Sequence, residues 1–164
     1  MINNIVTLGH PALRQEAARI EAPSPELTDL TTNLFDTLAS AAGYGLSANQ
    51  IGGLRRVAVL VVEQTRVVLI NPEITAATGH SHGLEGCLSI PGIWARVHRH
   101  AEITVTTDTL EGGRDTHRFS GQLAIVAQHE IDHLLGMLFL ARLPLMERDF
   151  LLAKYRKLQK RVQR

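Results

Sequence analysis

The spacing of apolar residues predicts three helices. The first begins at the capping pair Ser24-Pro25 and carries its apolar residues on one face, and Gly43 is expected to end it. A second helix is expected to begin near Gly121, and because it is apolar nearly all round it should be buried. A third is expected over residues 144–162, beginning near Pro144. The apolar face of the first helix consists of Leu27, Leu30, Leu34, Leu38 and Ala41.

Four further segments have the composition or the alternation of β-strands. Their order along the chain, strands between helices without regular alternation, predicts an α+β fold with small, mostly antiparallel sheets around one central helix. A turn is expected at Asn71-Pro72, and Glu111-Gly112-Gly113 is typical of a hairpin. The predicted strands are Arg56–Val62, Arg66–Asn71, Glu102–Thr107 and Arg114–Phe119.

Length and composition indicate one compact domain over residues 1–164. A chain of 164 residues can bury a core of its own, and its net charge of +1 gives no general signal for a polyanionic partner. The longest apolar run, Val57 to Val62, is too short to cross a membrane, and the N-terminus MINNIVTLGH has no apolar stretch of signal-peptide length. We therefore expect a cytoplasmic protein without a membrane partner.

The strongest chemical signal is the segment His129-Glu130-Ile131-Asp132-His133. Residues four apart lie on one face of a helix, so both imidazoles can reach one metal ion. Glu130 can then stand beside a metal-bound water and take its proton. Two imidazoles and a carboxylate are costly to bury without partners, and a metal ion supplies them. The segment therefore predicts a catalytic metal site, which needs a third protein ligand.

Three positions compete for the role of third ligand. The extended zinc-protease pattern requires His six residues after the second His, but that position is Phe139, although Gly136 matches the pattern. A thermolysin-like site would use a downstream Glu, and only Glu147 is available. The single cysteine, Cys87, lies upstream and suits a reducing compartment. Taken alone, a lone thiol is more often a buried structural residue than a ligand.

A glycine-rich segment completes a three-part pattern. It lacks the third glycine of a dinucleotide fingerprint and the lysine of a phosphate loop. In order, the three parts read GYGLSANQ (43–50), EGCLS (85–89) and QHEIDH (128–133), and GHPALR (9–14) precedes them. Together they resemble the peptide deformylase family, and the resemblance covers essentially the whole chain. Ser47 replaces the first of two paired alanines of the family pattern and is equally small.

The resemblance implies a role for each matching residue. Cys87, His129 and His133 would bind the metal, which is ferrous iron in cells, although zinc, nickel or cobalt can occupy the same site. Glu130 would act as general base and acid, and the Gln50 amide and the Leu88 backbone N–H would bind the oxyanion. Residues implied to contact the substrate are Gly43, Tyr44, Gly45, Glu85, Gly86, Ile125, Val126 and His129.

The activity implied by the resemblance is metal-dependent removal of the N-formyl group from formyl-methionine on newly made polypeptides, with release of formate. The alternative is a deformylase-like metalloprotein with an altered substrate range, or one with a non-catalytic role in binding the ribosome or a nucleic acid. A zinc endopeptidase is disfavoured by Phe139. Tyr44 and Trp94 depart from the family pattern near the expected cleft, so preferences beyond the first substrate residue stay open.

Two groups of basic or metal-binding residues lie outside these motifs. The pairs His80/His82 and His98/His100 could hold adventitious metal, but solvated loop histidines are the more common case.

The C-terminal segment is basic without any acid after Asp149, which usually indicates a solvated helix face. In bacterial family members with a long C-terminal helix, this helix docks on the ribosome, so the resemblance implies the ribosome as a possible partner. Separately, a monomeric enzyme is expected. The basic residues are Lys154, Arg156, Lys157, Lys160, Arg161 and Arg164.

Overall fold

The computed structural model describes residues 1–162 as a mixture of helices and antiparallel strands; Arg164 of the basic segment lies outside the described residues. The strands form a five-stranded sheet in the order β1-β2-β3-β6-β7 and a two-stranded sheet of β4 and β5. The α-helices are α1 (Pro25–Ala41), α2 (Gly121–Leu134) and α3 (Leu145–Val162), and short 3-10 turns are η1 (Pro11–Arg14), η2 (Ala48–Ile51) and η3 (Phe139–Arg142). The strands are β1 (Gly45–Ser47), β2 (Val57–Val62), β3 (Thr65–Thr78), β4 (Ser81–Cys87), β5 (Ile90–Arg99), β6 (Glu102–Asp108) and β7 (Arg114–Ser120).

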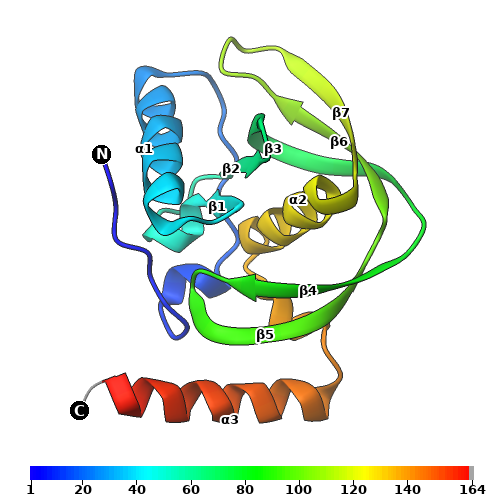
Figure 1. Cartoon of the computed structure of the whole chain (residues 1–164). Coiled ribbons are helices and arrows are strands. Elements are labelled where there is room, and N and C mark those ends of the chain that lie inside the picture. The colour runs from blue at the N-terminus through cyan, green and yellow to red at the C-terminus, as the bar shows by residue number, and fades with distance from the viewer. Residues whose placement is uncertain (163–164) are drawn as a thin grey trace.

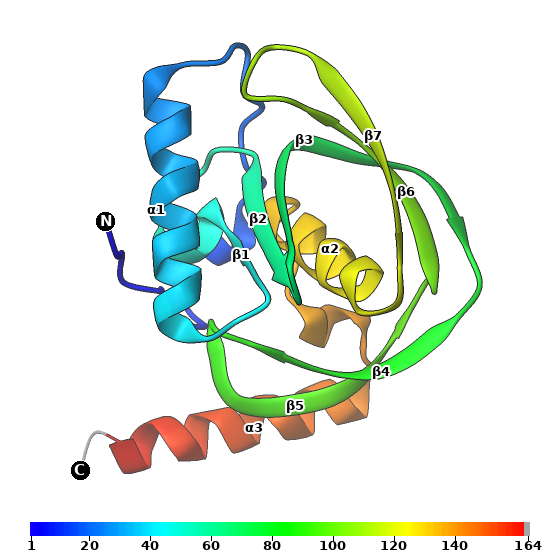
Figure 2. The ribbon, with the colours of Figure 1, turned by 45° about the horizontal axis from the view of Figure 1, so that its top comes forward.

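Helix α2 lies at the centre of the molecule. Figures 1 and 2 show it enclosed between the five-stranded sheet on one side and the β4–β5 ribbon on the other, with α3 running along β5. All strand pairs are antiparallel. The α+β prediction with small antiparallel sheets around a central helix is therefore confirmed.

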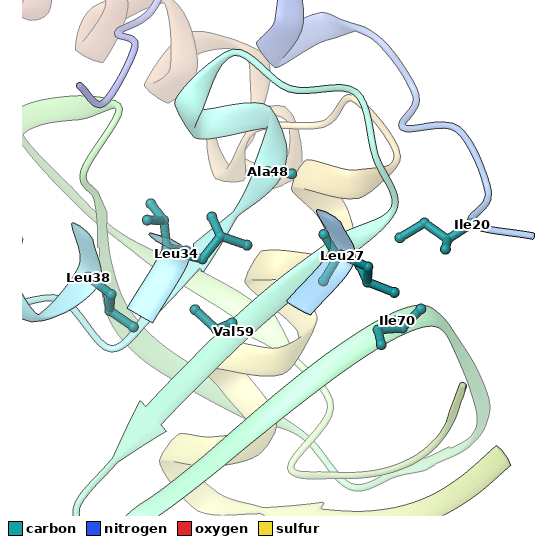
Figure 3. Packing of buried hydrophobic residues seen from close by; sticks show 9 residues of the cluster. Ile20, Leu27, Leu34, Leu38, Ala48, Val59 and Ile70 are labelled. Atoms are coloured by element: carbon teal, nitrogen blue, oxygen red, sulfur yellow. The ribbon is translucent and has the colours of Figure 1, made fainter. Parts of the chain in front are cut away.

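Helix α1 covers one part of the five-stranded sheet. The Ser24 hydroxyl accepts a hydrogen bond from the Leu27 N–H at 3.2 Å, which confirms the predicted cap. The prediction that Gly43 ends the helix is wrong by one residue: Ala42 takes the left-handed conformation (φ 52°), and its N–H bonds back to the last turn. Figure 3 shows leucines of α1 facing Val59 and Ile70 of the sheet.

The expected turn at Asn71-Pro72 is wrong, because β3 continues to Thr78. A β-bulge, with Asn71 at φ 49°, absorbs the proline, which has no N–H to donate to a ladder. The Asn71 side chain donates to the Ile20 carbonyl at 2.8 Å and accepts from the Ile20 N–H at 2.9 Å. A contact 51 residues apart in sequence therefore anchors the bulge, and the chain continues as a strand where the local pattern predicts a turn.

The β4–β5 ribbon was not predicted as a pair of strands, although β5 alternates clearly. Ile93, Ala95 and Val97 are buried and pack on the side that carries η3 and α3. The hairpin of β6 and β7 was predicted correctly, with Asp108 opposite Arg114. Within residues 1–162, no helix is long and apolar enough to cross a membrane.

Candidate metal centre

Helix α2 and strand β4 bring three metal-binding side chains together. His129 and His133 lie one turn apart on α2, and their Nε2 atoms are 3.2 Å from each other. Cys87 ends β4, and its Sγ atom lies 3.3 Å from the Nε2 of His133. Among the residues that the structure describes, these three form the only group of three or more potential ligands close enough to share an ion.

The distances within this group fit a single metal ion. Zinc–nitrogen and zinc–sulfur bonds of about 2.1 and 2.3 Å at a tetrahedral angle separate two nitrogens by about 3.4 Å and nitrogen from sulfur by about 3.6 Å. The observed separations are 3.2 Å between the imidazoles and 3.3 Å between His133 and Cys87. Without a cation, three atoms that carry lone pairs would lie this close together with too few hydrogens to form a hydrogen bond between each pair. The donor set therefore suits a transition metal of the thiolate- and imidazole-binding class.

Glu85 fixes the orientation of His129. The Nδ1–H of His129 donates to Glu85 Oε2 at 3.0 Å, which leaves the Nε2 lone pair facing Cys87 and His133. Arg99 donates to both oxygens of the same carboxylate, at 2.8 and 3.0 Å. Burial alone would raise the pKa of Glu85, but the hydrogen bonds from His129 and Arg99 lower it to about 2. Glu85 is therefore ionised when it orients the imidazole.

The two histidines differ in their affinity for a proton. Burial would lower the pKa of His129, but its hydrogen bonds with Cys87 and Glu85 raise that pKa to about 10. Burial, together with the charge of His129, lowers the pKa of His133 well below the ordinary value. The centre thus favours one positive charge between the Cys87 sulfur and the Glu85 carboxylate, and a metal ion supplies such a charge at the same place.

Glu130 lies beside these ligands with its carboxylate buried and partly unused. Its Oε2 atom has no hydrogen-bond partner, and burial raises its pKa to about 7. A buried carboxylate without a partner is costly, and such groups are typical of functional sites. The opposite wall of the site is Gly45, where a Cβ atom would come within 2.6 Å of Glu130 Oε1.

Gln50 faces the centre from the turn η2. Its Oε1 accepts hydrogen bonds from the backbone N–H and the hydroxyl of Ser47, at 3.0 and 3.2 Å. These bonds fix the amide so that its Nε2 donor is directed at Ser89 Oγ, 3.3 Å away, and at Cys87 Sγ, 3.7 Å away. The side chain is 1% exposed, so its donor group is held rigidly next to the metal ligands.

A cleft of about 630 Å³ opens onto this centre. Tyr44 and Trp94 are its exposed aromatic residues, with 56% and 61% of their surface accessible. The Glu85 side chain is buried against Arg99 and His129, so only its backbone is free to contact a ligand. All the residues predicted to contact substrate or oxyanion line the cleft: Gly43, Tyr44, Gly45, Gln50, Glu85, Gly86, Leu88, Ile125, Val126 and His129.

Other candidates for the metal site are not brought to it. Phe139, at the position of the third zinc-protease His, is buried with its ring centroid 6.0 Å from that of His129. Glu147 is exposed in α3. His82 and His98 lie on paired strands, not in loops, and their exposed rings are stacked at 4.0 Å. The zinc endopeptidase geometry is therefore absent from residues 1–162.

The polar residues behind His129 were not predicted from the sequence. Arg99 has a side chain that is only 1% exposed, and it bridges Glu85 and Asp132. A signal was available: Arg99 follows the inward-facing positions of Ile93, Ala95 and Val97 at a spacing of two. A guanidinium at an inward position of a strand requires acidic partners.

Comparisons with known proteins agree with this geometry. A sequence model of the family described as polypeptide deformylase matches residues 2–149. The peptide deformylase of Thermomicrobium roseum is 45% identical over 151 residues, which cover 87% of this chain and 86% of that protein. The structure of a Legionella pneumophila peptide deformylase superposes with a TM-score of 0.93 at 34% identity, covering 100% of this chain and 99% of the other.

A third similar protein has a bound compound. The structure of Ehrlichia chaffeensis peptide deformylase in complex with actinonin gives a TM-score of 0.90 at 31% identity, covering 95% of this chain and 96% of the other. Family model, sequence relatives and solved structures thus identify the same fold, and the Cys87, His129 and His133 group provides its metal site. The chain belongs to the peptide deformylase family.

Proposed function

We propose that this chain hydrolyses the N-formyl amide of formyl-methionine at the N-terminus of newly made polypeptides and releases formate. The observation that carries the proposal is the convergence of three metal ligands, an unpartnered buried carboxylate and a fixed amide donor on one cleft. A formyl amide is unactivated, so its hydrolysis needs a strong nucleophile, a proton acceptor and stabilisation of the oxyanion.

Cys87, His129 and His133 would hold the metal ion, which we propose to be Fe²⁺, with Zn²⁺, Ni²⁺ or Co²⁺ able to occupy the same ligands. When bound, such an ion supplies Lewis acidity that activates water at neutral pH and polarises the formyl oxygen. A thiolate and two imidazoles select borderline and soft ions over Mg²⁺ or Ca²⁺. The thiolate also makes the centre sensitive to oxidation.

Glu130 would move the proton. Its free Oε2 atom accepts the proton of the attacking water and then delivers it to the departing amine nitrogen, so that the products are formate and a free N-terminus. A pKa raised to about 7 by burial suits both directions of transfer at neutral pH. Gly45 and α2 confine the carboxylate between them, which keeps it beside the ligands.

Gln50 and Leu88 would stabilise the oxyanion. The Gln50 Nε2 donor is held near Cys87 by the bonds from Ser47, and the Leu88 backbone N–H follows Cys87 directly in the chain. Each such donor is worth about 3 kcal/mol in the transition state. Because the Gln50 donor is fixed before the reaction, no free energy is spent on orienting it during the reaction.

The substrate peptide would lie along the cleft in an extended form. Gly43, Tyr44 and Gly45 offer backbone groups on one side, and Glu85 and Gly86 on the other. Ile125 and Val126 of α2 provide an apolar wall that suits a methionine side chain. Backbone hydrogen bonds to an extended peptide carry little sequence preference, as an enzyme that processes many nascent chains requires.

We extend the proposal to the ribosome through the basic face of α3. Lys154, Arg156, Lys157, Lys160 and Arg161 are exposed, and none of them forms an ion pair with another described residue. Such charges suit the phosphates of ribosomal RNA. Each proposed catalytic group comes from one chain, so we propose a monomer. We also propose that it acts in the cytoplasm, because the proposed substrate is a newly made polypeptide.

The test is formate release from a formyl-Met-Ala-Ser peptide by enzyme loaded with Fe²⁺ under anaerobic conditions. We expect formate and a free amine in equal amounts, with internal peptide bonds intact. The Glu130→Ala variant is the matched control: it should keep its metal while activity falls roughly a hundredfold or more. Cleavage of internal bonds in the formylated and the unblocked peptide at comparable rates would contradict the proposal.

A further inference from the structure

A chain of buried ion pairs extends from the metal ligand His129 to the protein surface. Its members, called the ionic chain below, are Glu85, Arg99, Asp132 and Arg142. The charges alternate in sign, two acids and two arginines, so each buried charge has a partner. Removing a partner from such a network leaves an uncompensated charge, so its members hold one another in place.

The first part of the ionic chain closes a ring on α2. His129 donates to Glu85, and Arg99 holds Glu85 with two hydrogen bonds. The remaining Nη1 of Arg99 donates to Asp132 Oδ2 at 2.5 Å. His129 and Asp132 lie three residues apart on the same face of α2, so the β4–β5 ribbon is attached to the helix at two neighbouring points.

This ring spans the two elements that share the metal site. Cys87 lies on β4, two residues after Glu85, whereas His129 and His133 lie on α2. The distance between the sulfur and the imidazoles therefore depends on how β4 is held against α2. The ring fixes that distance through the planar, two-pronged contact of Arg99 with Glu85, which tolerates little rotation, and through single hydrogen bonds from Arg99 to Asp132 and from His129 to Glu85.

Arg142 holds the ring from outside. Its Nε and Nη2 atoms donate to the two oxygens of Asp132, both at 2.6 Å, and its side chain is 41% exposed while the other three are at most 5% exposed. Arg142 belongs to η3, only three residues before α3 begins. It is therefore the one member of the ionic chain that can be replaced without opening a buried cavity.

We propose that Arg142 is a positioning residue for the metal centre: by fixing Asp132, it holds Arg99 and Glu85, and through them the ring of His129, in the orientation that binds the ion. This inference deepens the proposed function and rests on the metal centre described there. Losses of about 10- to 100-fold in metal affinity or activity are typical when a residue that orients a metal ligand is removed. Arg142 acts at greater distance, so we expect the lower end of this range.

The experiment compares wild type with Arg142→Gln, Arg142→Lys and a control, Arg148→Gln. Arg148 is a partly exposed arginine on α3, paired among the described residues only with its neighbour Asp149 and outside the ionic chain. Three properties are measured well below the unfolding temperature: the rate at which Zn²⁺ is released to a chromogenic chelator, the visible absorption spectrum of the Co²⁺ form, and the His129 Nδ1–H proton resonance of the metal-free protein. Melting temperatures are recorded for all variants.

We expect Arg142→Gln to release Zn²⁺ about tenfold faster, with a changed Co²⁺ spectrum and a weakened or shifted Nδ1–H resonance. Arg142→Lys, which keeps the charge but not the fork, should recover part of these properties, and Arg148→Gln should match wild type. A lower melting temperature with unaltered release rate and spectra would overturn the inference, as would equal effects in the Arg148→Gln control. Failure of wild type itself to bind Zn²⁺ or Co²⁺ would instead refute the proposed metal centre.

Discussion

The carboxylate of Glu130 lies against the α-carbon of Gly45. A Cβ atom at position 45 would come 2.6 Å from Glu130 Oε1 and 2.8 Å from Val126 Cγ1. Gly45 begins β1 across the cleft from α2, so the space left by its missing side chain is filled by the proposed base. This close contact means that a single methyl group would displace the carboxylate.

Gly45→Ala is therefore expected to lower kcat by up to about a hundredfold, because a displacement of ~1 Å is enough to misplace a reacting group. The measurement is the rate of formate release at saturating peptide, together with metal content, which should be unchanged. The control is Gly83→Ala on β4, where the nearest atom to an added Cβ lies 3.5 Å away, an ordinary contact. Equal activity of the two variants would show that the Glu130 position is not critical.

Replacing Gln50 tests the oxyanion donor. Gln50→Ala removes the Nε2 group near Cys87, and we expect kcat to fall by about a hundredfold. Gln50→Glu has the same shape but loses the donor, so it should be impaired at least as strongly. Ser89→Ala removes only an acceptor of the same amide and serves as the control. Full activity of Gln50→Glu at unchanged metal content would eliminate the donor role.

Cys87→Ser tests whether the thiolate binds the metal. A serine hydroxyl is a poor ligand for borderline ions, so we expect loss or exchange of the metal. Elemental analysis after dialysis of Zn²⁺-loaded protein measures the stoichiometry. In the Fe²⁺ form of the unmodified protein, brief peroxide treatment should abolish activity, whereas the Ni²⁺ form should resist. An unchanged stoichiometry in Cys87→Ser would return Cys87 to the role of a structural thiol.

Trp94 is placed to influence which peptides are preferred. It pairs with Gly86 across β4 and β5, and a Cβ at position 86 would come 2.8 Å from its ring. The ring therefore covers the strand beside the cleft with an exposed apolar surface. Trp94→Ala should raise KM for peptides with large apolar residues after methionine more than for those with serine or alanine. Identical KM changes for all peptides would indicate a purely structural role.

The basic face of α3 is expected to contribute to ribosome binding. Replacing Arg156, Lys157, Lys160 and Arg161 by Gln should weaken co-sedimentation with ribosomes, and wild-type binding should fall steeply with salt because phosphate contacts release counterions. Turnover of a short free peptide should stay the same, since Leu151 and Tyr155 still pack on the core.

The control for that variant replaces two exposed arginines of β7, Arg114 and Arg118, by Gln, and so removes two positive charges where the α3 variant removes four. It lowers the net charge without touching α3, so it should bind ribosomes nearly as wild type does. If the α3 variant binds as well as wild type at low salt, electrostatic docking through this helix is ruled out.

The sequence by itself determined the features that depend on neighbours within a few positions. The i, i+4 spacing of His129 and His133 places both imidazoles on one side of any helix, and the Ser24 cap begins α1 through a local hydrogen bond. The hairpin of β6 and β7 follows in the same way from its glycine turn. The similarity to a known family added the roles of Gln50 and Cys87, which their local sequence leaves ambiguous.

Only the tertiary structure decided which distant residues meet. Cys87 lies 46 residues from His133, and its sulfur becomes a candidate ligand because β4 packs against α2. Arg99 and Asp132 are 33 residues apart, and nothing in local periodicity pairs them. The same is true of Asn71, whose bond to Ile20 anchors the bulge through which β3 continues. Local patterns record which face of an element is buried, whereas pairing of buried charges and ligands depends on how the elements pack together.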